Sequence, residues 1–198
     1  MPERVAGILL AGGGSSRLGQ PKQLLDWKGV PFVRQVAETA LAAQLSPVIV
    51  VTGAAAAEVS AALHGLDVHI VHNPGWAEGQ SSSVKAGLAA VPADAAAAIF
   101  MAVDQPQLPV RLLDSLKEQH AFNQRPIVAT LVDGRRSMPV LFDRSTFADF
   151  KILQGDMGGR ALFSTYQVTW FPWLDNSMAI DVDTMEDYQR LLRTLSQD

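Results

Sequence analysis

The feature that most constrains the fold of this chain is a regular alternation between short apolar runs and amphipathic stretches. Runs such as "VAGILL" (5–10) and "PVIVVTG" (47–53) are continuously hydrophobic. Strands of that kind are covered on both faces, so the pattern predicts a three-layer, Rossmann-like α/β fold with a mostly parallel sheet. Further strands are expected at 67–73, 96–104 and 126–134, and helices at 31–44, 55–65, 79–91, 110–122 and 184–195.

The C-terminal part of the chain is less regular. It holds the apolar runs "MPVLF" (138–142) and "VTWFPW" (168–173), with two short helical pieces around 154–160. Thr184 and Asp187 have capping-box spacing at the start of the last helix. Because 198 residues contain no repeat or linker, we expect a single domain over residues 1–198.

Charge and cysteine content exclude several classes of protein. The net charge of -4 and the absence of a Lys/Arg block argue against nucleic-acid and membrane-surface binding. The chain has no cysteine, which excludes disulfides, thiolate nucleophiles and iron–sulfur clusters and fits a reducing compartment. Its N-terminal apolar run is too short to span a membrane, and Glu3 stands where a signal peptide would be basic. We therefore expect a cytoplasmic protein without nucleic-acid or membrane partners.

Ligands of an open parallel sheet bind at the carboxyl ends of its strands. The candidate loops are therefore 11–22, 73–82, 104–109, 133–137 and the turn before the last helix. The first loop matches neither of two common phosphate-binding patterns. Arg17 stands at the third glycine position of the dinucleotide fingerprint, while Gln20 and Pro21 replace the Lys and Ser/Thr of the P-loop.

The first loop nevertheless has the chemistry of a phosphate site. Glycines let backbone N–H groups converge on an anion, hydroxyls add donors, an arginine grips phosphate oxygens bidentately and a lysine adds a point charge. The residues are Gly12, Gly13, Gly14, Ser15, Ser16, Arg17 and Lys22. The alternative is a tight strand exit with solvated basic residues. The phosphate interpretation is favoured because the chain has few other basic clusters.

Two aspartates are candidate metal ligands. Asp104 ends the buried run "AIFMAV", where a carboxylate costs desolvation unless a cation or a donor meets it. Asp183 precedes the last helix, and its alternative role is a charge that favours the helix dipole. Together the two carboxylates are predicted to hold Mg²⁺ against an α-phosphate. The four histidines lack metal-ligand spacing and are taken as structural.

The segment "LAGGGSSRLGQPK" resembles the signature loop of the nucleotidyltransferases that act on molybdenum cofactor, and more broadly that of sugar-phosphate and isoprenoid nucleotidyltransferases. Further segments resemble that family in the same order: "NPGWAEGQSSSV" (73–84), "DQP" (104–106), "GDMGGR" (155–160) and "DVDTMEDY" (181–188). The resemblance implies a fold of the nucleotide-diphospho-sugar transferase type. It also implies an enzyme that transfers NMP from an NTP to the phosphate of a molybdopterin-type cofactor, with Mg²⁺, and releases pyrophosphate.

The resemblance also implies roles for individual residues. The catalytic residues would be Arg17, Lys22 and Asp104, and the metal ligands Asp104 and Asp183. The nucleotide would be bound by Leu10, Ala11, Gly12, Gly13, Gly14, Ser15, Arg17, Lys22, Gly79 and Ser83. No protein nucleophile is required, because positioning and charge neutralisation carry out the catalysis.

The sequence motifs give mixed signals on which nucleobase and which acceptor the enzyme uses. "LAGG" is more typical of enzymes that use GTP, whereas "DQP" and "NPGWAEG" are typical of the CTP branch, so we expect CTP with GTP as the alternative. Ser137-Met138 stands where the family often has Gly-His, in a region that faces the acceptor. One alternative is therefore a sugar- or polyol-phosphate nucleotidyltransferase. Another is a maturation partner that binds nucleotide or cofactor without turnover. Transient contact with a molybdoenzyme or its chaperone is a possible further partnership.

Overall fold

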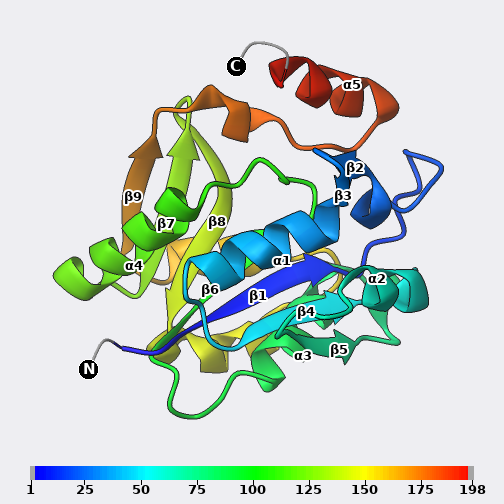
Figure 1. Cartoon of the computed structure of the whole chain (residues 1–198). Helices are drawn as coiled ribbons and strands as arrows, with labels where there is room; N and C mark the ends of the chain where they lie inside the picture. Colours follow the sequence, from blue (N-terminus) through cyan, green and yellow to red (C-terminus); the bar gives the residue numbers. More distant parts are fainter. Residues whose placement is uncertain (1–2, 196–198) are drawn as a thin grey trace.

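A seven-stranded sheet forms the centre of the computed structural model, which describes residues 3–195. Its strand order is β5-β4-β1-β6-β8-β7-β9 (Figure 1). The strands are β1 (Val5–Ala11), β4 (Val48–Thr52), β5 (His69–His72), β6 (Ala97–Ala102), β7 (Ile127–Val132), β8 (Arg135–Asp143) and β9 (Val168–Trp173). All neighbours pair in parallel except β8, which runs antiparallel to both β6 and β7. The predicted mostly parallel sheet is confirmed.

Helices cover both faces of the sheet. One face carries α1 (Phe32–Ala42), α2 (Ala56–Ala62), α4 (Val110–Asn123) and α5 (Met185–Thr194). The other carries α3 (Gln80–Ala89) and the 3-10 helices η3 (Arg144–Ile152) and η4 (Gly159–Ser164). Consecutive residues of β1 face opposite layers, since Leu9 belongs to the first hydrophobic cluster and Ile8 to the second. The continuous apolar runs are therefore explained by burial on both faces, and the three-layer fold is confirmed.

Short elements join the larger ones at the carboxyl end of the sheet. They are η1 (Lys22–Leu24), the hairpin strands β2 (Asp26–Trp27) and β3 (Val30–Pro31), η2 (Trp76–Glu78) and η5 (Asn176–Ala179). The predicted capping box begins α5: the Thr184 hydroxyl accepts from the Asp187 N–H, and Asp187 accepts from the Thr184 N–H. The Tyr188 hydroxyl then donates to the Asp26 carbonyl at 2.8 Å. These contacts fix the start of α5 and the segment before it near the β2–β3 hairpin.

The prediction of a loop over residues 133–137 is wrong. The chain reverses over Asp133 and Gly134, whose φ angles are 49° and 69°, and β8 already begins at Arg135. An Asp-Gly pair with two positive φ angles forms the two-residue turn that suits a twisted hairpin. Residues 135–137 therefore belong to the sheet, and the hairpin places β8 between β6 and β7.

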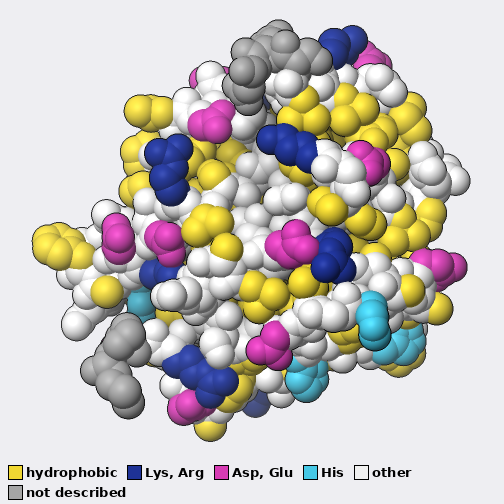
Figure 2. Space-filling model, in the orientation of Figure 1, with side chains coloured by type: hydrophobic (Ala, Val, Ile, Leu, Met, Phe, Trp, Pro, Cys, Tyr) yellow, Lys and Arg dark blue, Asp and Glu magenta, His cyan; other side chains and the backbone are white. Residues whose placement is uncertain are grey.

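Surface features complete the description. On the face shown in Figure 2, Lys and Arg side chains are interspersed with Asp and Glu. None of the helices formed by residues 3–195 has the length and apolar character needed to cross a membrane.

Candidate functional site

The loops that follow β1, β5 and β6 meet at the carboxyl ends of these strands and line a cavity of about 400 Å³. The structure brings most of the predicted nucleotide-binding residues to this cavity. They are Leu10, Gly12, Gly13, Gly14, Lys22, Gly79 and Ser83, and the predicted metal ligand Asp104 lines the cavity with them. The other predicted nucleotide-binding residues, Ala11, Ser15 and Arg17, are not among its lining residues. Trp76 also lines it and packs against the glycine loop, where a methyl group on Gly14 would lie 3.1 Å from the indole ring. Their roles in binding remain predictions.

The glycine loop is held in shape by a residue that sequence reasoning missed. Gln23 is fully buried, and its Nε2 donates to the carbonyls of Ala11 and Gly13 at 2.8 Å each. The only signal in the sequence is a polar residue within the short run "QLL". A methyl group on Gly13 would meet no atom within 4 Å. The loop therefore presents open backbone at Gly13 while its carbonyls are fixed from behind.

Ser15 shapes the loop in this structure. Its φ of 52° is left-handed, and its hydroxyl accepts from the backbone N–H of Lys22 at 3.0 Å. That contact closes the loop on itself and fixes where the Lys22 side chain leaves the backbone. The predicted contact of Ser15 with nucleotide stays a prediction.

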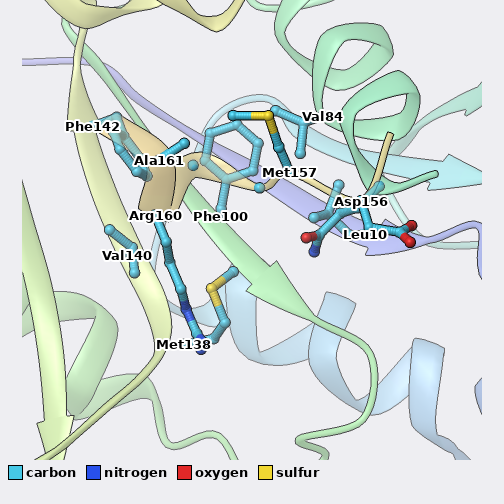
Figure 3. A pocket seen from close by; sticks show the side chains of 13 residues that line it. Leu10, Val84, Phe100, Met138, Val140, Phe142, Asp156, Met157, Arg160 and Ala161 are labelled. Atoms are coloured by element: carbon cyan, nitrogen blue, oxygen red, sulfur yellow. The ribbon is translucent and has the colours of Figure 1, made fainter. Parts of the chain in front are cut away.

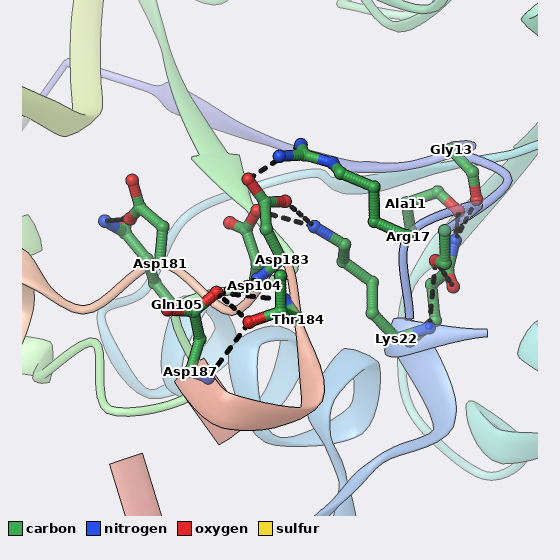
Figure 4. Close-up of polar contacts among 12 residues, drawn as sticks. Ala11, Gly13, Arg17, Lys22, Asp104, Gln105, Asp181, Asp183, Thr184 and Asp187 are labelled. Carbon is green, nitrogen blue, oxygen red and sulfur yellow. Dashed lines mark hydrogen bonds and ion pairs between the residues drawn. The ribbon is translucent and has the colours of Figure 1, made fainter. Parts of the chain in front are cut away.

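The Lys22 ammonium lies between the two predicted metal ligands (Figure 4). Its Nζ is 3.1 Å from Asp104 Oδ2 and 2.7 Å from Asp183 Oδ1. Arg17 Nη2 donates to the other oxygen of Asp183 at 2.9 Å. Four residues from three distant segments thus form one alternating cluster of charges. The expectation that the two carboxylates converge beside the glycine loop agrees with this geometry.

The cluster stabilises its own ionised state. Burial alone would lower the pKa of the Lys22 ammonium, but the charges and hydrogen bonds of Asp104 and Asp183 outweigh it and raise that pKa. The hydrogen bond from Lys22 lowers the pKa of Asp183, which outweighs the opposite effect of partial burial. The Lys22 ammonium and the Asp183 carboxylate are therefore both charged near neutral pH.

Gln105 and Asp181 form a second polar layer that sequence reasoning did not assign. The Gln105 side chain is buried, and its Nε2 donates to Asp181 Oδ1 at 2.8 Å and to Ser137 Oγ at 3.1 Å. Burial raises the pKa of Asp181, and the nearby charge of Asp104 raises it further. Gln105 follows Asp104 in "DQP", so this motif fixes the end of β6 against β8 and the segment before α5.

The segment before α3 is packed against the 155–160 segment. The Asn73 amide donates to the hydroxyls of Ser82 and Ser83 at 2.8 and 3.0 Å. Gly79 has a φ of 109°, and a methyl group there would lie 2.3 Å from the Gly155 carbonyl carbon. Only glycine fits at this position. The two family-like segments 73–84 and 155–160 therefore build one wall of the cavity.

The donor set of the acidic pair fits a hard divalent cation. Asp104 and Asp183 direct carboxylate oxygens at one point, and Mg²⁺ commonly takes one or two protein carboxylates and completes its shell with water and substrate phosphates. No group of three or more His, Cys, Asp or Glu within residues 3–195 is arranged to hold a metal ion. Any cation here would therefore complete its coordination shell with water and substrate oxygens.

Comparison with known proteins shows the family. Residues 7–169 match the MobA-like NTP transferase domain. The chain is 34% identical over 202 residues to nicotine blue oxidoreductase of Paenarthrobacter nicotinovorans, which covers 95% of this chain and 96% of that protein. It is 27% identical over 204 residues to a probable molybdenum cofactor guanylyltransferase of Bacillus cereus strain AH187, with coverages of 98% and 99%.

Solved structures agree with the match in sequence. Rv0371c from Mycobacterium tuberculosis H37Rv superposes with a TM-score of 0.83 at 30% identity, covering 96% of this chain and 98% of that one. The manganese complex of the same protein superposes with a TM-score of 0.78 at 28% identity and the same coverages. Since the domain match spans most of the sheet and the whole glycine loop, this chain belongs to the MobA-like NTP transferase family.

Proposed function

We propose that this protein transfers a nucleoside monophosphate from an NTP to the phosphate of a molybdopterin-type cofactor and releases pyrophosphate. The observation that carries the proposal is the Lys22 ammonium between Asp104 and Asp183, with Lys22, Asp104 and the open backbone of Gly13 lining one cavity. Backbone donors, a lysine and paired carboxylates are the parts that a triphosphate and its cation require.

The reaction would proceed by direct displacement at the α-phosphorus. An oxygen of the acceptor phosphate forms a bond to that phosphorus, and the bond from phosphorus to the bridging oxygen breaks. The electron pair leaves with pyrophosphate. Arg17 and Lys22 would stabilise the charge that develops on the α-phosphate and the leaving group, while the glycine loop holds the chain of phosphates in line.

Asp104 and Asp183 would hold Mg²⁺ in this scheme. Their carboxylates are hard donors, and a relative, Rv0371c, has been solved in complex with manganese. When bound, the cation would neutralise phosphate charge at the reacting phosphorus. The aspartates themselves position that charge, since Gln105 and the capping box of α5 fix the segments that carry them.

We infer CTP as the preferred nucleotide and GTP as the alternative. The CTP-type segment "NPGWAEG" contributes Trp76 and Gly79 to the cavity wall, while the GTP-type "LAGG" contributes Gly12 and Gly13. The "DQP" sequence adds to the first group. The Bacillus relative is named a guanylyltransferase, so the two nucleotides need a direct comparison.

The test is pyrophosphate release with each of the four NTPs, with and without molybdenum cofactor, together with the mass of the product. We expect release that needs both substrates and Mg²⁺, and a dinucleotide product with the mass of the CMP adduct. The Asp104→Asn variant serves as the inactive control. Release without cofactor, or no release with any NTP, would contradict the proposal.

Pyrophosphate release, measured beside dye absorbance and ligand binding, separates the competing activities. Reduction of nicotine blue, which the name of the Paenarthrobacter relative raises, would change dye absorbance in the presence of a reductant without forming pyrophosphate. A sugar- or polyol-phosphate transferase would release pyrophosphate with those acceptors. A maturation partner would bind nucleotide and cofactor without turnover. Group transfer is favoured because Lys22 and Asp104 line the cavity, and Lys22 joins Asp104 to Asp183 in an arrangement that suits phosphate chemistry.

A further inference from the structure

A groove of about 350 Å³ lies between α3 and η3, apart from the site described above. Among residues 3–195, it shares no lining residue with the nucleotide cavity. Nor does it share any of them with the neighbouring cavity of about 540 Å³, which is lined in part by Phe100, Phe142 and Arg160 (Figure 3). A molecule bound in the groove would therefore leave both cavities open.

Helical spacing gathers the apolar side chains that line the groove. Leu88 and Ala89 follow Lys85 by three and four positions, which puts the three residues on one face of α3. In η3, Phe147 and Phe150 are three positions apart, the spacing at which side chains of a 3-10 helix align. Phe150 is buried, Leu88 and Phe147 are half-buried, and Ala89 is exposed. The two elements therefore form an apolar trough that is open to solvent.

Three cations, Lys85, Arg144 and Lys151, also line this trough. Lys85 and Arg144 donate to backbone carbonyls, and Arg144 Cζ lies 5.2 Å from the centre of the Phe147 ring. Within residues 3–195 none of the three cations forms an ion pair, and no carboxylate is among the lining residues. The chain as a whole has 20 acidic and 16 basic residues, so its composition does not account for such a group. The trough therefore combines apolar walls with positive charge that no carboxylate neutralises.

We propose that the groove between α3 and η3 binds an amphipathic helix of a partner protein, with acidic residues beside the apolar face of that helix. An amphipathic helix places its apolar face in a hydrophobic groove, and glutamates beside that face would meet Lys85, Arg144 and Lys151. A flat anionic membrane fits less well, because the apolar residues line a hollow rather than protrude. The proposal does not depend on the nucleotidyl transfer, since the groove and the nucleotide cavity are separate.

The test is the fluorescence anisotropy of a labelled synthetic peptide of about 18 residues, long enough to form a helix in water, titrated with the full chain. The peptide carries leucine at positions i, i+3, i+4 and i+7 and glutamate beside that stripe. We expect saturable binding with a micromolar Kd that rises with NaCl, because salt screens exposed charges. A peptide with lysine in place of glutamate, and a shuffled peptide without the apolar stripe, should each bind about tenfold more weakly or not at all.

Variants of the chain locate the peptide. Lys85→Gln combined with Lys151→Gln should raise the Kd about fivefold to twentyfold, as for two partly exposed ion pairs, and should weaken its dependence on NaCl. Ala89→Glu is expected to fold, since Ala89 is exposed and glutamate forms helices well, and to raise the Kd more than the uncharged Ala89→Gln. A matched control is Arg111→Gln, which removes an exposed cation from α4 on the opposite face of the sheet and should leave the Kd unchanged. Saturating CTP should also leave it unchanged.

Several results would overturn the proposal. They are no binding of the acidic peptide, equally tight binding of the lysine or the shuffled peptide, and an equal Kd in wild type and the double lysine variant. Phosphatidylglycerol vesicles that bind wild type but not the double lysine variant, without peptide binding, would assign these cations to a membrane surface instead. Pyrophosphate release is measured separately and should be equal in wild type and the groove variants, so failure of the groove proposal leaves the proposed reaction unaffected.

Discussion

Replacing Lys22 by methionine should expose the repulsion that this residue now neutralises. Methionine keeps an unbranched apolar stem and removes the charge. The Lys22 side chain is only 15% exposed and contacts Asp104 and Asp183 at once. Without the ammonium, the two carboxylates face each other across the site with only Arg17 left on one of them. The variant should therefore lose stability as well as activity.

The size of the effect follows from the geometry. Because both carboxylates contact the same nitrogen, their oxygens lie at most about 6 Å apart, where two like charges repel by roughly 3 kcal/mol at an effective dielectric constant of about 20. Asp104 and Asp183 are 22% and 38% exposed, so solvent screens part of this repulsion. We expect a loss of about 1–2 kcal/mol, which corresponds to a fall of roughly 2–8 °C in Tm for a chain of this size.

Thermal unfolding with and without MnCl₂ tests this reasoning. Mn²⁺ should raise the Tm of Lys22→Met more than that of wild type, because the cation relieves a repulsion that wild type has already neutralised. Turnover should fall by about 10²-fold or more, as for the loss of one preorganised donor. Lys151→Met, which removes an exposed cation from η3, is the control and should behave as wild type. A Lys22→Met variant as stable as that control, with no extra gain from Mn²⁺, would refute the argument.

Three further outcomes are expected. Gly13→Ala should fold with unchanged or slightly greater stability, since its methyl group meets nothing within 4 Å, but should raise the Kd for CTP in calorimetry by about tenfold; an unchanged Kd would contradict the phosphate loop. Asp104→Asn and Asp183→Asn should each abolish most Mg²⁺-dependent turnover, and the double variant should be little worse than either, whereas losses that multiply would show separate roles. Because the hydrogen bond from Lys22 lowers the pKa of Asp183 below 3.8, its stabilisation is complete above that value and is lost as the pH falls through the lowered pKa. The Tm of wild type should thus fall more steeply than that of Lys22→Met below about pH 4, and parallel curves would refute the coupling.

Local sequence patterns determined the elements and the order in which they occur. Burial on both faces of a strand leaves a continuous apolar run, as in 5–10, and burial on one face of a helix leaves a 3.6-residue period, as in 31–44. The capping box of Thr184 and Asp187 was equally readable, because both hydrogen bonds join residues three positions apart. The glycine loop was recognised for the same reason, since its chemistry lies within a dozen consecutive residues.

Only the tertiary structure decided how these parts act together. Lys22 contacts Asp104 and Asp183 across 82 and 161 positions of the chain, and no local period encodes a contact of that kind. The antiparallel place of β8 followed from one Asp-Gly turn, and the burial of Gln23 from the carbonyls that needed a donor behind the glycine loop. Arg160 lines a cavity formed in part by β6 and β8, which are neighbours in the sheet. Such contacts are fixed by strand order and packing, which depend on every element at once.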